Sequence, residues 1–179
     1  VRMPRIGILC FGDTYLSCAA GFSDVLGVGN VHLREARVQG DPFECIILSE
    51  TGGPVSGNGG LTIGTQAAAT AGVLDVVVIP AIHYPGYKRF ARFLDERDET
   101  YAWLNSQWRR GAWIGANCTG TFLLAQSGLL AGRPATTTWW LDRQFRSRYP
   151  KVDLQFRSVL TEADRLLCAG ATATFMLQS

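Results

Sequence analysis

The sequence predicts an α/β domain, built on a mostly parallel sheet with helices on both faces. Short apolar runs alternate along the chain with segments of helical spacing, as in consecutive strand and helix units. The runs at residues 6–11 and 75–79 are continuously apolar, which is typical of strands buried on both faces. The 179 residues, 47% of them hydrophobic, suffice for one core, so residues 1–179 are expected to form one domain.

The same criteria place the other elements along the chain. Residues 16–26 carry apolar and small side chains at helical spacing and close at Gly27 and Gly29, which predicts a first helix. The glycine-rich stretch 51–60 lacks the lysine and hydroxyl pair of a phosphate-binding loop and is predicted to be a turn or hairpin. Further strands are expected at residues 32–38, 44–48, 113–114, 152–154, 159–161 and 166–168, a short extended element at 132–138, and helices at 67–71, 87–94, 100–110, 121–130 and 139–149.

A single cysteine stands at the turn between a strand and a helix in residues 111–130. Cys118 is flanked at two residues' distance by Ala116 and Gly120, and small residues are what a sharp, strained bend requires. A position before a helix also favours the thiolate. In a parallel sheet this turn and the irregular loop 80–86 both lie beyond the carboxyl ends of strands, where ligands bind. The pattern predicts a reactive-cysteine site or the relic of one, and an ordinary buried cysteine is the alternative.

Composition and charge exclude several classes of protein. The formal net charge is +2, and the basic residues are scattered apart from Arg109, Arg110 and the stretch 143–148, so no nucleic-acid surface is expected in this chain. The five cysteines are odd in number and widely spaced, unlike a disulfide framework or a metal site. Neither a signal peptide nor an apolar run of membrane-spanning length is visible. We therefore expect a soluble, cytoplasmic protein without a metal or an organic cofactor.

The segment around the cysteine resembles a known family. Residues 115–139 read GANCTGTFLLAQSGLLAGRPATTTW, and together with residues 148–152 and 169–173 they are similar to the ThiJ/PfpI family of the class I glutamine amidotransferase-like superfamily. Within it, the chain looks most like the amino-terminal domain of AraC-type (GlxA-like) transcriptional regulators, over essentially its whole length. The resemblance implies a flavodoxin-like three-layer sandwich and a homodimer.

The chain departs from the enzymes of that family at each partner of the cysteine. In those enzymes the cysteine works with an acidic residue on the first helix, often with a histidine after the elbow helix, and with backbone donors near a glycine pair. By the resemblance, Cys18 takes the acidic position, Thr138 the histidine position, and Ala81 with Ile82 the glycine pair. A thiol and a hydroxyl handle protons poorly near neutral pH. The resemblance therefore implies a degenerate nucleophile elbow, in which the Ile82 N–H is still expected to be able to donate.

The first hypothesis for the function is a binding domain that senses an unknown small-molecule ligand and biases the geometry of a homodimer. Its pocket is expected to be lined by Cys18, Ile82, His83, Cys118, Thr119 and Thr138, with Trp139 as a further ligand contact. DNA would be bound through a downstream helix-turn-helix module that is absent from this chain. Residues 174–179 begin like an apolar helix and stop within two turns, which favours a fragment of a longer protein.

Two alternatives remain open. The first is a cysteine-dependent ThiJ/PfpI enzyme, such as an isonitrile hydratase-like lyase, with Cys118 catalytic and His83 standing in for the missing histidine. The second is a redox sensor in which Cys118 and Cys18 lie close enough for a disulfide. Asp13 is the acidic residue nearest in sequence to the empty carboxylate position, and no role is assigned to it.

Overall fold

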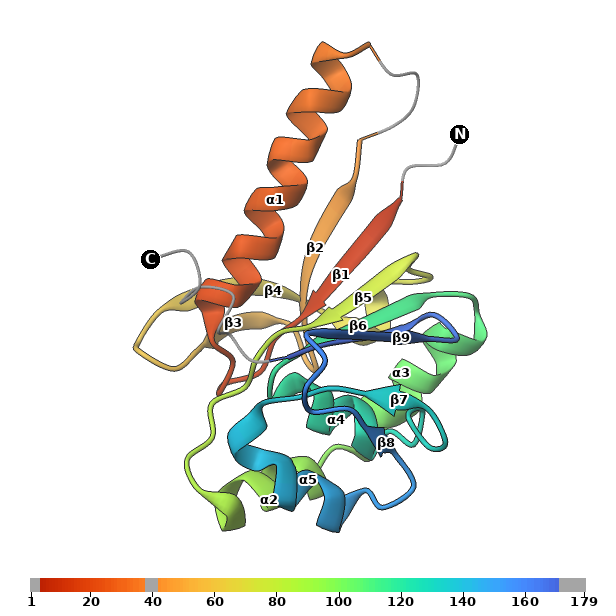
Figure 1. Cartoon of the computed structure of the whole chain (residues 1–179). Coiled ribbons are helices and arrows are strands. Elements are labelled where there is room, and N and C mark those ends of the chain that lie inside the picture. Colours follow the sequence, from red (N-terminus) through yellow and green to blue (C-terminus); the bar gives the residue numbers. More distant parts are fainter. Residues whose placement is uncertain (1–3, 38–41, 171–179) are drawn as a thin grey trace, which may run out of the picture.

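The computed structural model describes residues 4–37 and 42–170, and its centre is an eight-stranded sheet in the order β3-β4-β2-β1-β5-β6-β10-β9 (Figure 1). All neighbouring strands in it are parallel except the two edge pairs, β3 with β4 and β9 with β10. The strands are β1 (Arg5–Leu9), β2 (Glu44–Ser49), β3 (Gly53–Ser56), β4 (Thr62–Ala67), β5 (Val76–Ile79), β6 (Trp113–Asn117), β9 (Leu160–Ala163) and β10 (Leu166–Ala169). Two short strands, β7 (Pro134–Ala135) and β8 (Asp153–Leu154), pair separately.

Helices cover both faces of the sheet, which confirms the predicted three-layer arrangement. One helix, α1, lies on one side, and α2 to α5 lie on the other (Figure 1). The helices are α1 (Leu16–Glu35), α2 (Tyr87–Asp95), α3 (Asp98–Arg109), α4 (Gly120–Gln126) and α5 (Asp142–Arg148), with short 3₁₀ turns η1 (Ala68–Thr70) and η2 (Trp139–Leu141).

The strand β1 and its extension show why the central runs are apolar throughout. Ile8 and Cys10 pack toward α1, in a small core with Leu16 and Ala19. Leu9 and Phe11 point the other way, into the main core with side chains of α2, α3 and α4. Because successive side chains of a strand alternate between its faces, burial on both faces requires a continuous apolar run.

The sheet order brings three loops together at one edge. The neighbours of β1 are β2 on one side and β5 on the other, so the strand order reverses at β1. The pairs Ile8 with Val78 and Ile79 with Ala116 keep β1, β5 and β6 in step. The loops that follow these strands therefore meet beyond their carboxyl ends, where parallel α/β sheets bind ligands.

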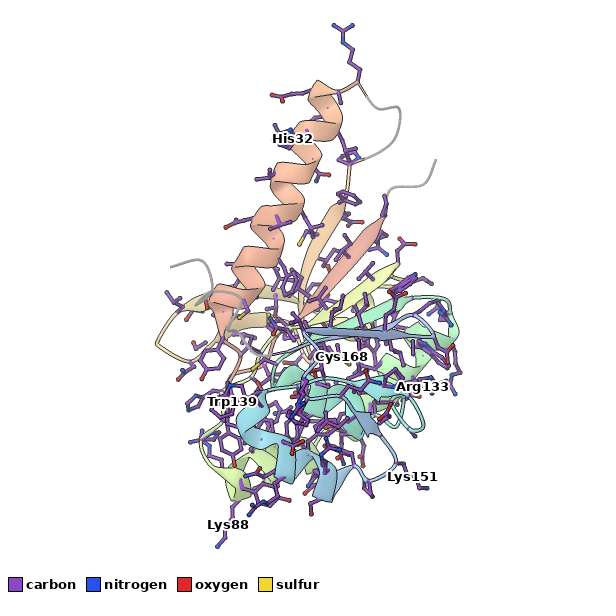
Figure 2. The ribbon with its side chains drawn as sticks, in the orientation of Figure 1. His32, Lys88, Arg133, Trp139, Lys151 and Cys168 are labelled. Atoms are coloured by element: carbon purple, nitrogen blue, oxygen red, sulfur yellow. The ribbon has the colours of Figure 1, made fainter. Side chains whose placement is uncertain are left out.

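The first helix departs from the prediction. It does not close at Gly27 and Gly29, and the strand predicted at residues 32–38 is wrong, because α1 runs to Glu35 and contains His32 in its last turn (Figure 2). Val38 lies outside the described residues. Glycine weakens a helix by about 1 kcal/mol without breaking it, and a tertiary contact favours the helical state here. The Asn30 amide accepts the Phe43 N–H at 2.6 Å and donates to the Phe43 carbonyl at 2.9 Å.

The other elements follow the predictions with smaller changes. The glycine-rich stretch enters the antiparallel pair β3–β4, so a hairpin is confirmed. The helix predicted at residues 121–130 is shorter, because α4 ends at Gln126 and Gly128 takes a φ of +84°. The helix predicted at 139–149 divides into η2 and α5. The helix start predicted at residues 174–179 lies outside the described part.

Two kinds of feature are absent from the described residues. No helix there combines the length and the apolar character needed to cross a membrane. Within the same residues, His, Cys, Asp and Glu side chains form no group of three or more that could hold a metal ion.

Candidate functional site

Cys118 lies at a strained turn between β6 and α4. Its φ is +54°, a left-handed conformation that costs a residue with a side chain about 1–2 kcal/mol. Three hydrogen bonds hold the backbone of this residue. The Cys118 N–H donates to the Ala169 carbonyl at 2.9 Å, and the Cys118 carbonyl accepts from the Thr137 hydroxyl at 2.7 Å and from the Thr121 N–H at 3.2 Å. The sharp bend that the small residues around Cys118 predict is thus present, and contacts with neighbouring segments hold it in place.

Gly120 allows the start of α4 to approach the end of β5. A Cβ atom at this position would lie 2.7 Å from both the Ile79 and the Pro80 carbonyl oxygens. Such a distance is shorter than real Cβ contacts, so only glycine fits without a backbone shift. This close approach places the preceding residue, Thr119, next to the loop after β5.

The Thr119 hydroxyl forms hydrogen bonds with both backbone polar groups of Ile82. Its hydroxyl oxygen accepts the Ile82 N–H at 2.7 Å, and the hydroxyl donates to the Ile82 carbonyl at 2.6 Å. Both residues are buried, so the pair is shielded from water. The expectation that the Ile82 N–H is able to donate to a developing oxyanion is therefore wrong in this structure, because that donor is already engaged.

A cavity of about 470 Å³ opens beside the turn. Its volume is in the range of sites that take small organic molecules. The walls offer hydroxyls, thiols and aromatic rings, and among the residues that the structure describes, none of the lining side chains is a carboxylate, an imidazole, an amine or a guanidinium. They are Tyr15, Ser17, Cys18, Ala81, Ile82, Tyr84, Cys118, Thr119 and Trp140.

Cys18 and Cys118 meet in this cavity. With Ala81 they form a buried cluster of their own, and their exposed fractions are only 6% and 3%. Burial raises the pKa of the Cys18 thiol, a hydrogen bond with the Ala81 backbone partly offsets this, and a negative charge on Cys118 raises it again. Burial raises the pKa of Tyr15 too, and charges on Cys118 and Cys18 add to that rise. Cys18 and Tyr15 are therefore neutral near pH 7.

His83 does not line the cavity, contrary to expectation, but contacts one of the residues that do. Its Nδ1 atom is 3.1 Å from the Tyr15 hydroxyl, and the two rings meet edge to face with centroids 5.9 Å apart. The His83 backbone N–H donates to the Asp13 carbonyl at 2.7 Å. Asp13 in turn directs its carboxylate to Arg89 at 3.7 Å. Neither Asp13 nor His83 is among the residues that line the cavity, so both contact it only through others.

Thr138 and Trp139 also lie away from the cavity lining, contrary to expectation. Thr138 is fully buried, and its hydroxyl oxygen has no hydrogen-bond partner within the described part of the chain. Trp139 is 67% exposed and lies at the edge of the molecule (Figure 2). The neighbouring Trp140, whose ring packs edge to face on Trp139 at 5.6 Å, is the tryptophan that lines the cavity.

Of the residues expected at the site, the structure thus brings Cys18, Ile82, Cys118 and Thr119 together. Sequence reasoning missed the aromatic walls and two small residues: Tyr15, Ser17, Ala81, Tyr84 and Trp140. Tyr15 is the N-cap of the helix that carries Cys18 and lies three residues before it, a spacing that places two side chains on the same side of a helix. That local signal was available, whereas the orientation of Trp140 was not.

A second cavity, of about 540 Å³, lies near the start of α3 and is rich in acidic residues. Its basic group, Arg97, is engaged: it pairs with Glu50 at 2.5 Å and stacks over the Phe93 ring at 3.9 Å. Thr100 donates to the same carboxylate at 2.6 Å. We assign the candidate site to the other cavity, because it is lined by Cys118, the residue that the sequence singles out.

Comparisons with known proteins relate the chain to regulators. No protein-family model matches it. Its sequence is 31% identical over 173 residues to the HTH-type transcriptional regulator CdhR of Pseudomonas aeruginosa, which covers 92% of this chain and 48% of that protein. The chain therefore spans about half the length of this curated relative.

Solved structures share the fold. That of an AraC family transcriptional regulator from Pseudomonas putida has a TM-score of 0.66 at 19% identity, covering 93% of this chain and 83% of that one. That of a ThiJ/PfpI family protein from Pseudomonas syringae has a TM-score of 0.67 at 18% identity, covering 96% of this chain and 64% of that one. The flavodoxin-like fold expected from the resemblance is confirmed by these structures.

Proposed function

We infer that this ThiJ/PfpI-type domain, which is related to AraC-family transcriptional regulators, is the ligand-sensing and dimerisation domain of such a regulator. DNA binding is assigned to a separate helix-turn-helix module outside this chain. The ligand is an unidentified small molecule held in the cavity beside Cys118.

The uncharged lining of that cavity is the observation that carries the proposal. A cysteine enzyme needs a group that takes and returns a proton, and such a group contributes about two to four powers of ten in rate. The lining supplies thiols, hydroxyls and aromatic rings instead. The Ile82 N–H is engaged by Thr119, and the His83 ring faces Tyr15. Such walls suit the recognition of a small molecule better than its chemical conversion.

The helix α1 links the cavity to a candidate dimer surface. Its first turn carries Ser17 and Cys18, which line the cavity. Farther along, three valines spaced three residues apart are exposed by 70%, 57% and 46%: Val25, Val28 and Val31. This part of the helix stands away from the body of the molecule (Figure 1). Exposed apolar residues that gather on one helix support a protein interface, and a second copy of the chain is the occupant we propose.

A matched pair of α1 variants tests the sensor. Ser17 is exposed and lines the cavity, so Ser17→Trp fills the cavity without entering the core. Ala20 is equally exposed on the same helix but does not line the cavity, so Ala20→Trp is the control. We expect that compounds from a panel of small neutral and zwitterionic metabolites raise the melting temperature of the wild type and of Ala20→Trp, but not of Ser17→Trp.

Two results would overturn the sensor. One is a stabilising compound whose effect survives in Ser17→Trp, because binding would then lie elsewhere. The other is catalysis: hydration of cyclohexyl isonitrile by the wild type that is lost in Cys118→Ala would replace the sensor with an isonitrile hydratase-like lyase.

A further inference from the structure

Two of the chain's cysteines share one cavity, and the other three do not. Cys18, from the first turn of α1, and Cys118, from the turn before α4, pack with Ala81 and line the same space. Cys10 belongs to the small core under α1, and Cys168 to the main core. Cys45 lies half-buried on β2. No disulfide joins any of the five, all of which lie in the described residues.

We propose that Cys118 and Cys18 form a dithiol site that reacts with hydroperoxides, in which Cys118 is oxidised first and Cys18 resolves the product to a disulfide. The Cys118 thiolate attacks one oxygen of the hydroperoxide, the O–O bond breaks, and an alcohol or water leaves after protonation. The resulting sulfenic acid is attacked by the Cys18 sulfur, which loses its proton, and water leaves as the S–S bond forms. The hydroperoxide is reduced by two electrons, and the two thiols supply them.

The division of roles follows from the surroundings of Cys18. Its thiol keeps its proton because burial raises its pKa and a charge on Cys118 raises it further. Cys18 is therefore the sulfur that keeps its proton, and Cys118 is assigned the first attack. Once Cys118 is a sulfenic acid, that charge is gone, and one of the causes that hold the proton on Cys18 disappears with it. Oxidation of Cys118 therefore makes it easier for the Cys18 thiol to lose its proton and attack.

The cavity provides access for the oxidant. Both cysteines are almost fully shielded by the fold, with residue exposures of 6% and 3%, yet both line an open space large enough for a hydroperoxide. A disulfide would occupy part of that space and tie the first turn of α1 to the turn before α4. If the proposed ligand-sensing function holds, oxidation would then compete with ligand binding, and this consequence alone rests on that function.

The test uses hydrogen peroxide on the reduced chain. We expect the wild type to lose two of its five titratable thiols and about 2 Da of mass, and to recover both with dithiothreitol. Proteolytic mapping should find one cross-linked species that contains Cys18 and Cys118. In Cys18→Ser the sulfenic acid has no resolving partner, so Cys118 should gain about 32 Da as sulfinic acid, irreversibly.

Cys45→Ser is the matched control, because Cys45 is the least buried cysteine and lies outside the cavity. It should lose two thiols like the wild type. The proposal is overturned if mapping of the wild type links another pair, or if the wild type gains about 32 Da as Cys18→Ser does. Mapping of the wild type decides this even where a variant fails to fold. The metabolite screen measures melting temperatures, whereas this test measures thiols, mass and cross-linked peptides. Failure of the proposed ligand-sensing function can therefore be distinguished from failure of the proposed dithiol site.

Discussion

The substitution Gly120→Ala tests the close approach of α4 to β5, because it has two effects that change the free energy of unfolding in opposite directions. Helix propensity favours alanine over glycine by about 1 kcal/mol in a helix. Against this, the new Cβ would lie 2.7 Å from two backbone oxygens, whereas ordinary contacts begin at 3.4 Å. Each oxygen is therefore too close by about 0.7 Å, and neither belongs to a side chain that is able to rotate away.

Overpacking of a well-packed core costs about 1–3 kcal/mol. Because both oxygens are backbone atoms, the upper part of that range applies, about 2–3 kcal/mol. After the gain in propensity is subtracted, we expect Gly120→Ala to lower the free energy of unfolding by about 1–2 kcal/mol. For a chain of this size the melting temperature should fall by about 2–8 °C.

The assay is urea denaturation followed by circular dichroism, with Gly115→Ala as the matched control. Gly115 lies in β6, five residues before Gly120, and a Cβ there meets nothing within 4 Å. This control should be unchanged or more stable by up to about 1 kcal/mol, because alanine restricts the unfolded chain. A Gly120→Ala variant as stable as the wild type would refute the reasoning, since it would show that the oxygens yield without strain.

Three further predictions follow from single contacts. Thr119→Val removes both hydrogen bonds to Ile82 and should lower the free energy of unfolding in urea by about 1–3 kcal/mol, whereas Thr119→Ser should remain near the wild type. Burial raises the pKa of the Cys168 thiol to about 11. The unfolded thiol ionises near pH 8.5, so stability should fall as the pH rises from 8 to 10, and Cys168→Ala should lose about 2 kcal/mol less than the wild type in that interval. Val28→Asp should convert a dimer to a monomer in sedimentation velocity with little change in stability. Val159→Asp, at a position 76% exposed in the connection before β9, should remain dimeric, and a monomeric wild type would contradict the dimer.

The fold was largely predictable because its central strands are buried on both faces. Runs such as β5 are apolar at every position, and a short run of this kind favours a strand covered by helices on each side. The length of α1 was not predictable, because glycines suggested an end that the contact between Asn30 and Phe43 overrides. Local sequence patterns reflect the intrinsic preference of residues for helix or strand. They contain no information on a contact between two residues 13 positions apart.

The site was predictable only in part, and the reason differs from residue to residue. The bend at Cys118 follows from small neighbours that the sequence displays. The hydrogen bond from the Ile82 N–H to Thr119 joins a backbone amide to a side chain 37 residues away, and no local sequence pattern contains such a contact. Trp139 and Trp140 are adjacent and chemically alike, so only the geometry of η2 decides which of them lines the cavity.

The uninterrupted course of α1 has a mechanical consequence. Its 20 residues correspond to a rod of about 30 Å, with Cys18 near one end and Glu35 at the other. Pivoting this rod by about 5° at the cavity would swing its distal tip through about 2.6 Å, roughly half a helical pitch. A small rotation next to residue 18 is thereby magnified at the remote end of the helix, toward the surface where we propose that a second copy of the chain binds.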